Sequence, residues 1–134
     1  MSIMYKSTRS NSEKVTASQA ILKGLADDGG LFVPDSIPAL DVELEKLAGL
    51  SYQETAYEVM KLFLSDFTKE ELLHCIHGAY DDKFDTKEIA PLVKKDGAFY
   101  LELFHGKTIA FKDMALSILP YLMTTALRKE GITD

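Results

Sequence analysis

The sequence has a single cysteine, Cys75, so no disulfide can form within the chain. Such sparse use of cysteine is typical of proteins from a reducing compartment. Residues 1–10 lack the continuous apolar core of a signal peptide, and no run reaches the roughly 18 apolar residues of a membrane-spanning helix. Together these absences predict a soluble, cytoplasmic protein that does not cross a membrane.

Excess positive charge is also missing, because the net charge of the 134 residues is −6. The acidic residues are spread along the chain, as on a solvated surface, and give no electrostatic reason to bind nucleic acid or an anionic membrane. Apolar residues make up 46% and charged residues 27% of the chain, as in ordinary globular proteins. A chain of this length forms one domain and buries about two-thirds of its surface.

Most of the first ninety residues are expected to be helical. Three segments have the capping-box pattern of a helix start, and apolar residues at helical spacing follow each of them. The first helix is expected to end at Asp27-Asp28-Gly29-Gly30, where two glycines permit positive φ angles. The capping boxes are residues 16–19, 51–54 and 68–71; short strands are predicted at 4–8 and 31–33, and a brief helix at 42–48.

The remaining residues predict a hairpin that leads into a terminal helix. Two apolar runs, 91–93 and 98–104, flank an Asp96-Gly97 turn signal. A helix over Met114 to Leu127 follows, which Pro120 should bend or split. The sequence therefore predicts one domain over residues 1–134, helical over 1–90, with a small hairpin and a helix over 91–134.

A short loop, residues 105–108, separates the hairpin from this helix and places Lys112 at the helix start. A lysine amine attacks a carbonyl only when neutral, and lowering its pKa from about 10.4 to about 7–8 requires about 4 kcal/mol. A helix N-terminus supplies only about 0.3–1 kcal/mol, so desolvation has to supply most of it. Residues 109–111 are apolar enough to be expected to bury the amine. An ordinary solvated lysine at a helix start is the alternative interpretation.

Residues 104–113, Phe-His-Gly-Lys-Thr-Ile-Ala-Phe-Lys-Asp, closely resemble the signature of the threonine synthase family, usually His-Gly-Pro-Thr-hydrophobic-Ala-Phe-Lys-Asp. The resemblance spans the chain, because residues 5–9, 20–34, 51–54 and 90–93 are also similar to family segments in the family's order. Two positions depart from the family pattern. Lys107 stands where the family usually has proline, and Ser10 replaces a common glycine.

The resemblance implies an α/β enzyme of the fold type II pyridoxal-phosphate family, of which this chain is an N-terminal segment. In that family, the lysine that matches Lys112 carries pyridoxal 5′-phosphate. By the same resemblance, Phe111 and Asp113 are expected to support the cofactor, and His105 and Thr108 to contact substrate. His105 either orients a phosphate or caps its turn, and loop polar residues are often functional.

The implied reaction converts O-phospho-L-homoserine and water to L-threonine and phosphate, the last step of threonine biosynthesis. The segment on its own is expected to be inactive and to self-associate through apolar surface that the rest of the enzyme would cover. Two other functions stay open: another fold type II pyridoxal-phosphate enzyme, or a non-catalytic interaction module.

Other polar clusters predict little chemistry. Gly106-Lys107-Thr108 has the end of a phosphate-loop motif, but position 101, where the motif needs glycine, is leucine. His74 and His77 lie one helical turn apart without the converging ligands that zinc needs, so no metal is expected. Residues 27–30 form either a metal- or hydroxyl-binding turn or plain turn chemistry, and charge alone suggests residues 8 and 9 as phosphate contacts.

Overall fold

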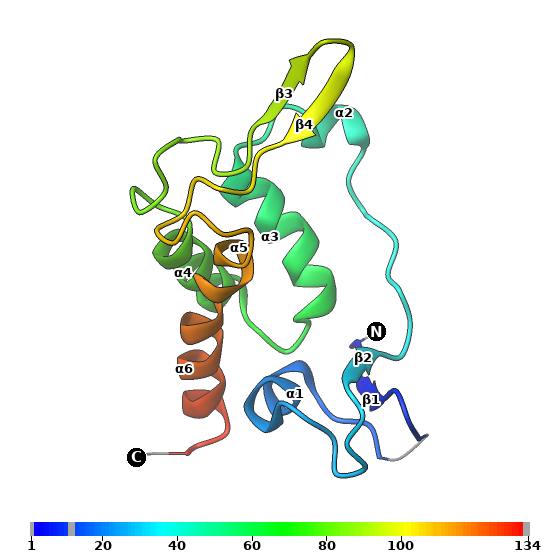
Figure 1. The fold of residues 1–134 in the computed structure, drawn as a ribbon. Helices are drawn as coiled ribbons and strands as arrows, with labels where there is room; N and C mark the ends of the chain where they lie inside the picture. Colours follow the sequence, from blue (N-terminus) through cyan, green and yellow to red (C-terminus); the bar gives the residue numbers. More distant parts are fainter. Residues whose placement is uncertain (1, 11–12, 133–134) are drawn as a thin grey trace.

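The computed structural model describes residues 2–10 and 13–132. Figure 1 shows helices α3, α4 and α6 beside one another, with the β3–β4 hairpin at one end and α1, β1 and β2 at the other. The elements are β1 (Tyr5–Ser7), α1 (Ala17–Lys23), β2 (Phe32–Pro34), α2 (Leu44–Leu47), α3 (Tyr52–Phe63), α4 (Lys69–Ala79), β3 (Leu92–Lys95), β4 (Ala98–Leu101), α5 (Asp113–Leu116) and α6 (Leu119–Lys129). The mostly helical character with small antiparallel sheets confirms the predicted fold class.

All three predicted capping boxes are formed, at the starts of α1, α3 and α4. At α4, for example, the Thr68 hydroxyl accepts a hydrogen bond from the Glu71 backbone N–H at 3.2 Å. The Glu71 carboxylate in turn accepts from the Thr68 N–H at 2.8 Å. Two backbone donors that a helix start leaves unpaired are thereby satisfied.

Helix α1 is shorter than the sequence predicted. It ends at Lys23, because Gly24 adopts φ 74° and closes the helix before residues 27–30 are reached. Those residues instead form a turn that is hydrogen-bonded to the last residue of β1, Ser7. The Asp28 carboxylate accepts hydrogen bonds from the Ser7 hydroxyl at 2.6 Å and the Gly30 N–H at 2.9 Å. Bonds within the chain therefore account for this turn.

The hydrophobic core lies between α4 and α6. Leu72, Cys75 and Ile76 of α4 are at most 1% exposed and pack in one cluster with Leu122 and Ala126 of α6. Cys75 is a free, buried cysteine, and its Sγ atom lies 3.4 Å from the Thr125 hydroxyl of α6. Helix α3 covers this cluster with side chains that are only partly buried.

The predicted hairpin and terminal helix are present, although β4 ends at Leu101 and does not extend over the whole predicted run 98–104. Strands β3 and β4 pair antiparallel, and the turn residues Asp96 and Gly97 both have positive φ, as a tight hairpin turn requires. Pro120 stands in the first turn of α6, where its missing N–H has no partner to lose, and the helix is split there into α5 and α6. Within the described residues, no helix is long and apolar enough to cross a membrane.

Gly78 allows α4 and α6 to approach closely, because a Cβ atom there would lie 2.4 Å from the Tyr121 ring. We expect Gly78→Ala to lower the free energy of unfolding by about 1–3 kcal/mol, the usual result of overpacking. Gly49→Ala is the matched control, since its Cβ would meet only the Lys46 carbonyl at 3.6 Å. Urea unfolding of both variants measures the difference; equal stability would show that the helices do not depend on this contact.

Candidate functional site

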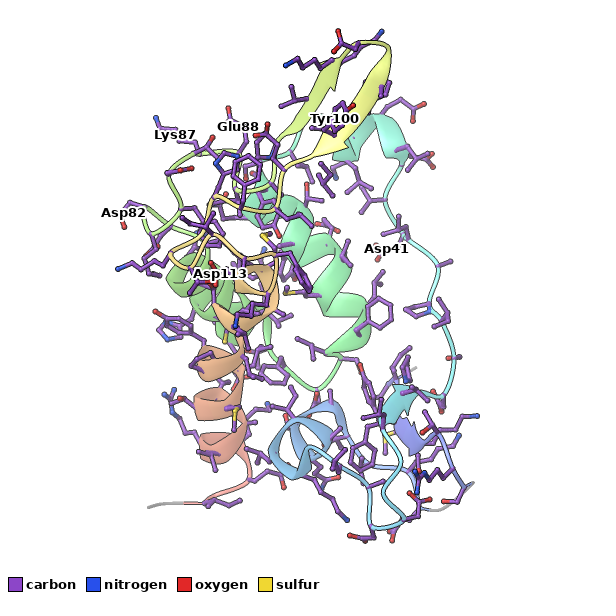
Figure 2. The ribbon with its side chains drawn as sticks, in the orientation of Figure 1. Asp41, Asp82, Lys87, Glu88, Tyr100 and Asp113 are labelled. Atoms are coloured by element: carbon purple, nitrogen blue, oxygen red, sulfur yellow. The ribbon has the colours of Figure 1, made fainter. Side chains whose placement is uncertain are left out.

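The segment between β4 and α5 holds the sequence-predicted site residues, and we call residues 105–112 the lysine loop. Its end is fixed by Asp113, the first residue of α5, whose carboxylate accepts two hydrogen bonds from Thr108. The Thr108 N–H donates at 2.8 Å and the Thr108 hydroxyl at 2.7 Å. These bonds hold the pKa of Asp113 below its ordinary value, so the residue is an anion at neutral pH. Figure 2 shows Asp113 where the loop meets α5.

Close packing against Asp113 explains why residue 106 of the lysine loop is glycine. A Cβ atom on Gly106 would lie 2.6 Å from both the Cβ and a carboxylate oxygen of Asp113. Three residues after Gly106, Ile109 adopts φ 66°, which is a genuine outlier for a β-branched residue. Such a conformation costs about 1–3 kcal/mol and persists only where the surroundings fix it. The Ile109 N–H donates to the Gly106 carbonyl at 3.1 Å, and this bond closes the strained turn.

Lys112 occupies the N-cap position of α5, at the helix start that the sequence predicted, and its side chain makes no capping hydrogen bond. Its carbonyl accepts hydrogen bonds from the backbone N–H groups of Ala115 and Leu116. Among the described residues, no side chain forms a hydrogen bond or ion pair with its amine. The amine is therefore uncommitted, and its charge contributes to the lowered pKa of Asp113.

The expectation that residues 109–111 bury this amine is wrong for this chain. Lys112 is exposed, and the side chains beside it face solvent as well, with Ile109 71% and Phe111 74% exposed. Lys112 and Phe111 instead line an open, apolar hollow of about 740 Å³. Its other walls come from α3, the hairpin and α5, and include Tyr52, Leu101, Leu103 and Met114. Apolar neighbours in sequence thus form a wall beside the amine without enclosing it.

His105 begins the lysine loop and lies between two carboxylates. Its Nδ1 atom is 2.5 Å from an Asp85 oxygen and its Nε2 atom 2.8 Å from a Glu102 oxygen. The hydrogen bond to Glu102, with a second one to Asp85, raises the pKa of His105. With both ring nitrogens engaged, this arrangement has no ring donor that points to a substrate phosphate. Sequence reasoning missed Asp85, because nothing local marks a partner twenty residues away.

The other polar clusters lie apart from this loop. His74 and His77 are exposed on α4, and the described residues contain no group of three or more ligand-type side chains suited to a metal. Arg9 follows β1, at the end of the molecule opposite the hairpin (Figure 1), where its guanidinium donates to the Asp28 carbonyl at 3.2 Å. The structure therefore does not bring residues 8 and 9 to Lys112.

Comparison with known proteins identifies the family. Residues 4–80, more than half of the chain, match the family described as "Threonine synthase N terminus". The chain belongs to this family. It is 41% identical to the threonine synthase of Eremothecium gossypii and 42% identical to that of Schizosaccharomyces pombe, over 98% and 96% of its length. It spans only 27% and 26% of those two proteins, or about a quarter of their length.

Solved threonine synthases have the same fold over almost all of this chain. The pyridoxal-phosphate-bound enzyme of Brucella melitensis superposes with a TM-score of 0.85 at 36% identity, over 97% of this chain and 28% of that one. The yeast threonine synthase gives 0.83 at 35% identity, over 95% and 27%. Both structural matches extend well beyond residue 80, which confirms the resemblance that the signature at residues 104–113 carries.

The Asp113–Thr108 contact has a testable pH dependence. Because the pKa of Asp113 is lowered on folding, its contribution to stability is present above the ordinary value of 3.8 and is lost as pH falls through the lower folded value. We expect Asp113→Asn to lower the urea midpoint at pH 7, with a gap from the unsubstituted chain that narrows in acid. Asp82→Asn makes the same charge change on an exposed connector and is the control. Equal midpoints at pH 7 would contradict the assignment.

Proposed function

We propose that this chain is the N-terminal part of a threonine synthase that converts O-phospho-L-homoserine and water to L-threonine and phosphate. Lys112 is then the lysine that binds pyridoxal 5′-phosphate. The observation that carries this proposal is the place of Lys112, which lines an apolar hollow and whose amine forms no hydrogen bond or ion pair with a described side chain. A cytoplasmic location and a small-molecule substrate complete the proposal.

The residues present fit the cofactor. The aldehyde of the cofactor reacts with an amine that is not tied up in an ion pair, and the described residues form no ion pair with the Lys112 amine. The flat pyridine ring needs an apolar wall, which Phe111 and the hollow supply. When bound, pyridoxal phosphate withdraws electrons from the carbon next to the substrate amine. The protein's part is to place the groups that react with it.

The residues around Lys112 then have defined tasks. Lys112 would hold the cofactor through its Nζ atom and, once the substrate amine has taken its place, would carry protons at the same atom. Asp113 and Thr108 fix the backbone that carries this lysine, through the two hydrogen bonds between them. Phe111 forms part of the hollow's wall. Lys107 is exposed in the same loop.

The open hollow sets the expected affinity. A neutral, reactive lysine needs desolvation, but Lys112 is exposed in this chain. The described residues also contain no glycine-rich loop aimed at a cofactor phosphate. The 134-residue chain should therefore hold the cofactor weakly and lack turnover, and its exposed apolar side chains favour self-association.

We expect titration of the chain with pyridoxal phosphate to give a weak, reversible absorbance band of the lysine-bound cofactor. Lys112→Ala should abolish the band, while Lys107→Ala, a change of the same type five residues earlier, should keep it. A stable, stoichiometric band that depends on Lys112 would contradict weak binding. A weak band that survives in Lys112→Ala would contradict the assignment of the lysine.

The substrate is tested on a protein that carries this segment at the length of its relatives. We expect phosphate release from O-phosphohomoserine with threonine as the product, and no comparable turnover of serine or threonine. Replacing Lys112 by alanine should lower kcat by several orders of magnitude, because the covalent route is then lost. Turnover of serine or threonine instead would indicate a different enzyme of the same cofactor family.

A further inference from the structure

His105 joins two segments that are distant in sequence. One ring nitrogen faces Asp85, in the connector between α4 and β3, and the other faces Glu102, just after β4. A backbone bond reinforces the junction, since the Asp85 N–H donates to the His105 carbonyl at 3.0 Å. The imidazole is only 14% exposed, although the Asp85 carboxylate is 74% exposed. The connector is thus tied to the first residue of the lysine loop.

We propose that His105, as an imidazolium held between Asp85 and Glu102, is a positioning residue that fixes the start of the lysine loop and thereby the place of Lys112 beside the hollow. The part of this inference that concerns Lys112 rests on the proposed function. The role that follows for His105 is different from the substrate contact that the family resemblance implied. Its ring binds two carboxylates of the chain itself and so holds the first residue of the loop in place.

The loop needs an anchor at both ends because it contains a strained residue. Asp113 holds the end of the loop through Thr108, and His105 holds its start. Ile109 lies between the two anchors at φ 66°. A strained residue relaxes when its surroundings stop fixing it, so release of either anchor lets Ile109 return to an ordinary conformation. Lys112, three residues further on, would then move with the backbone.

The charge of the ring decides how strong the anchor at the loop's start is. A neutral imidazole has one N–H donor, whereas the imidazolium has two. Only the protonated ring can donate to Asp85 and Glu102 together, and hydrogen bonds between charged groups are the stronger kind. Two further described residues interact with the ring. The ring centre of Phe104 is 4.6 Å from that of His105, and the charge of His105 helps to lower the pKa of the Glu88 carboxyl.

The sign of the pH effect follows from the raised pKa of His105. The ring is protonated, and the anchor complete, below the ordinary value of 6.5. As pH rises through the higher folded value, the second N–H is lost and one carboxylate faces a lone pair. The lysine loop should therefore loosen on the alkaline side of the His105 titration.

Hydrogen exchange of two loop amides tests this without any cofactor. The Thr108 N–H donates to Asp113 and the Ile109 N–H to Gly106, so both report whether the loop is closed. In His105→Gln we expect protection factors of both amides to fall about tenfold, the effect of losing one charged hydrogen bond. The unsubstituted chain should show the same loss as pH rises through the His105 titration, and His105→Gln should show no such step.

Two further variants separate positioning from general stability. Asp85→Asn changes an exposed carboxylate and keeps an oxygen acceptor, so the fold is retained while the ion pair is lost. It should lower loop protection and weaken the pH step. His77→Gln alters an exposed histidine on α4 and should leave both unchanged. Protection factors in α4 should be equal in all variants, which excludes a global loss of stability as the cause.

The link to Lys112 is read from the rate at which added pyridoxal phosphate attaches to it, followed by absorbance. We expect this rate to fall severalfold in His105→Gln and Asp85→Asn and to be unchanged in His77→Gln. Absence of attachment in the unsubstituted chain would contradict the proposed function. The hydrogen-exchange result would still test whether His105 fixes the start of the loop, because it needs no cofactor. The inference is overturned if His105→Gln and Asp85→Asn both match His77→Gln in the protection of the loop amides, in the pH step and in the attachment rate.

Discussion

The contact on which this site depends is the pair of hydrogen bonds from Thr108 to the carboxylate of Asp113. It folds the chain back on itself between the hairpin and α5 and requires glycine at position 106. An anion in the first turn of α5 is also favourable for the exposed N–H groups there. Through this contact, one acidic residue fixes the backbone on both sides of Lys112.

The same geometry explains why the loop tolerates strain and why the hollow beside it is open. Ile109 is held at positive φ by bonds on either side, so its side chain points to solvent and is 71% exposed. Phe111 and the hairpin residue Leu101 are exposed as well, at 74% and 58%. Apolar side chains of this kind are stable on a surface only at a cost in solubility. The loop thus combines a hydrogen-bonded backbone with exposed apolar side chains.

The sequence predicted features that depend on local chemistry and missed those that depend on distant contacts. The capping boxes and the split at Pro120 follow from hydrogen bonds within four residues, and they are present as predicted. The end of α1 was misplaced because Gly24 competes with the glycines at 29 and 30, and local pattern does not rank them. The exposure of Lys112 depends on what packs over it, and its neighbours in sequence do not determine that. Asp85 lies beside His105 because the connector after α4 passes the lysine loop, and no sequence motif indicates the course of that connector.

In the proposed function, the lysine loop presents one particular amine, that of Lys112, to the aldehyde of the cofactor. Borohydride reduction makes the bond between a lysine and pyridoxal phosphate permanent, so peptide mass mapping then shows which lysine of the chain carries the label. We expect Lys112 to be labelled well ahead of the other exposed lysines, including Lys107 in the same loop. Preferential label on Lys107, or label distributed evenly over the surface lysines, would contradict it.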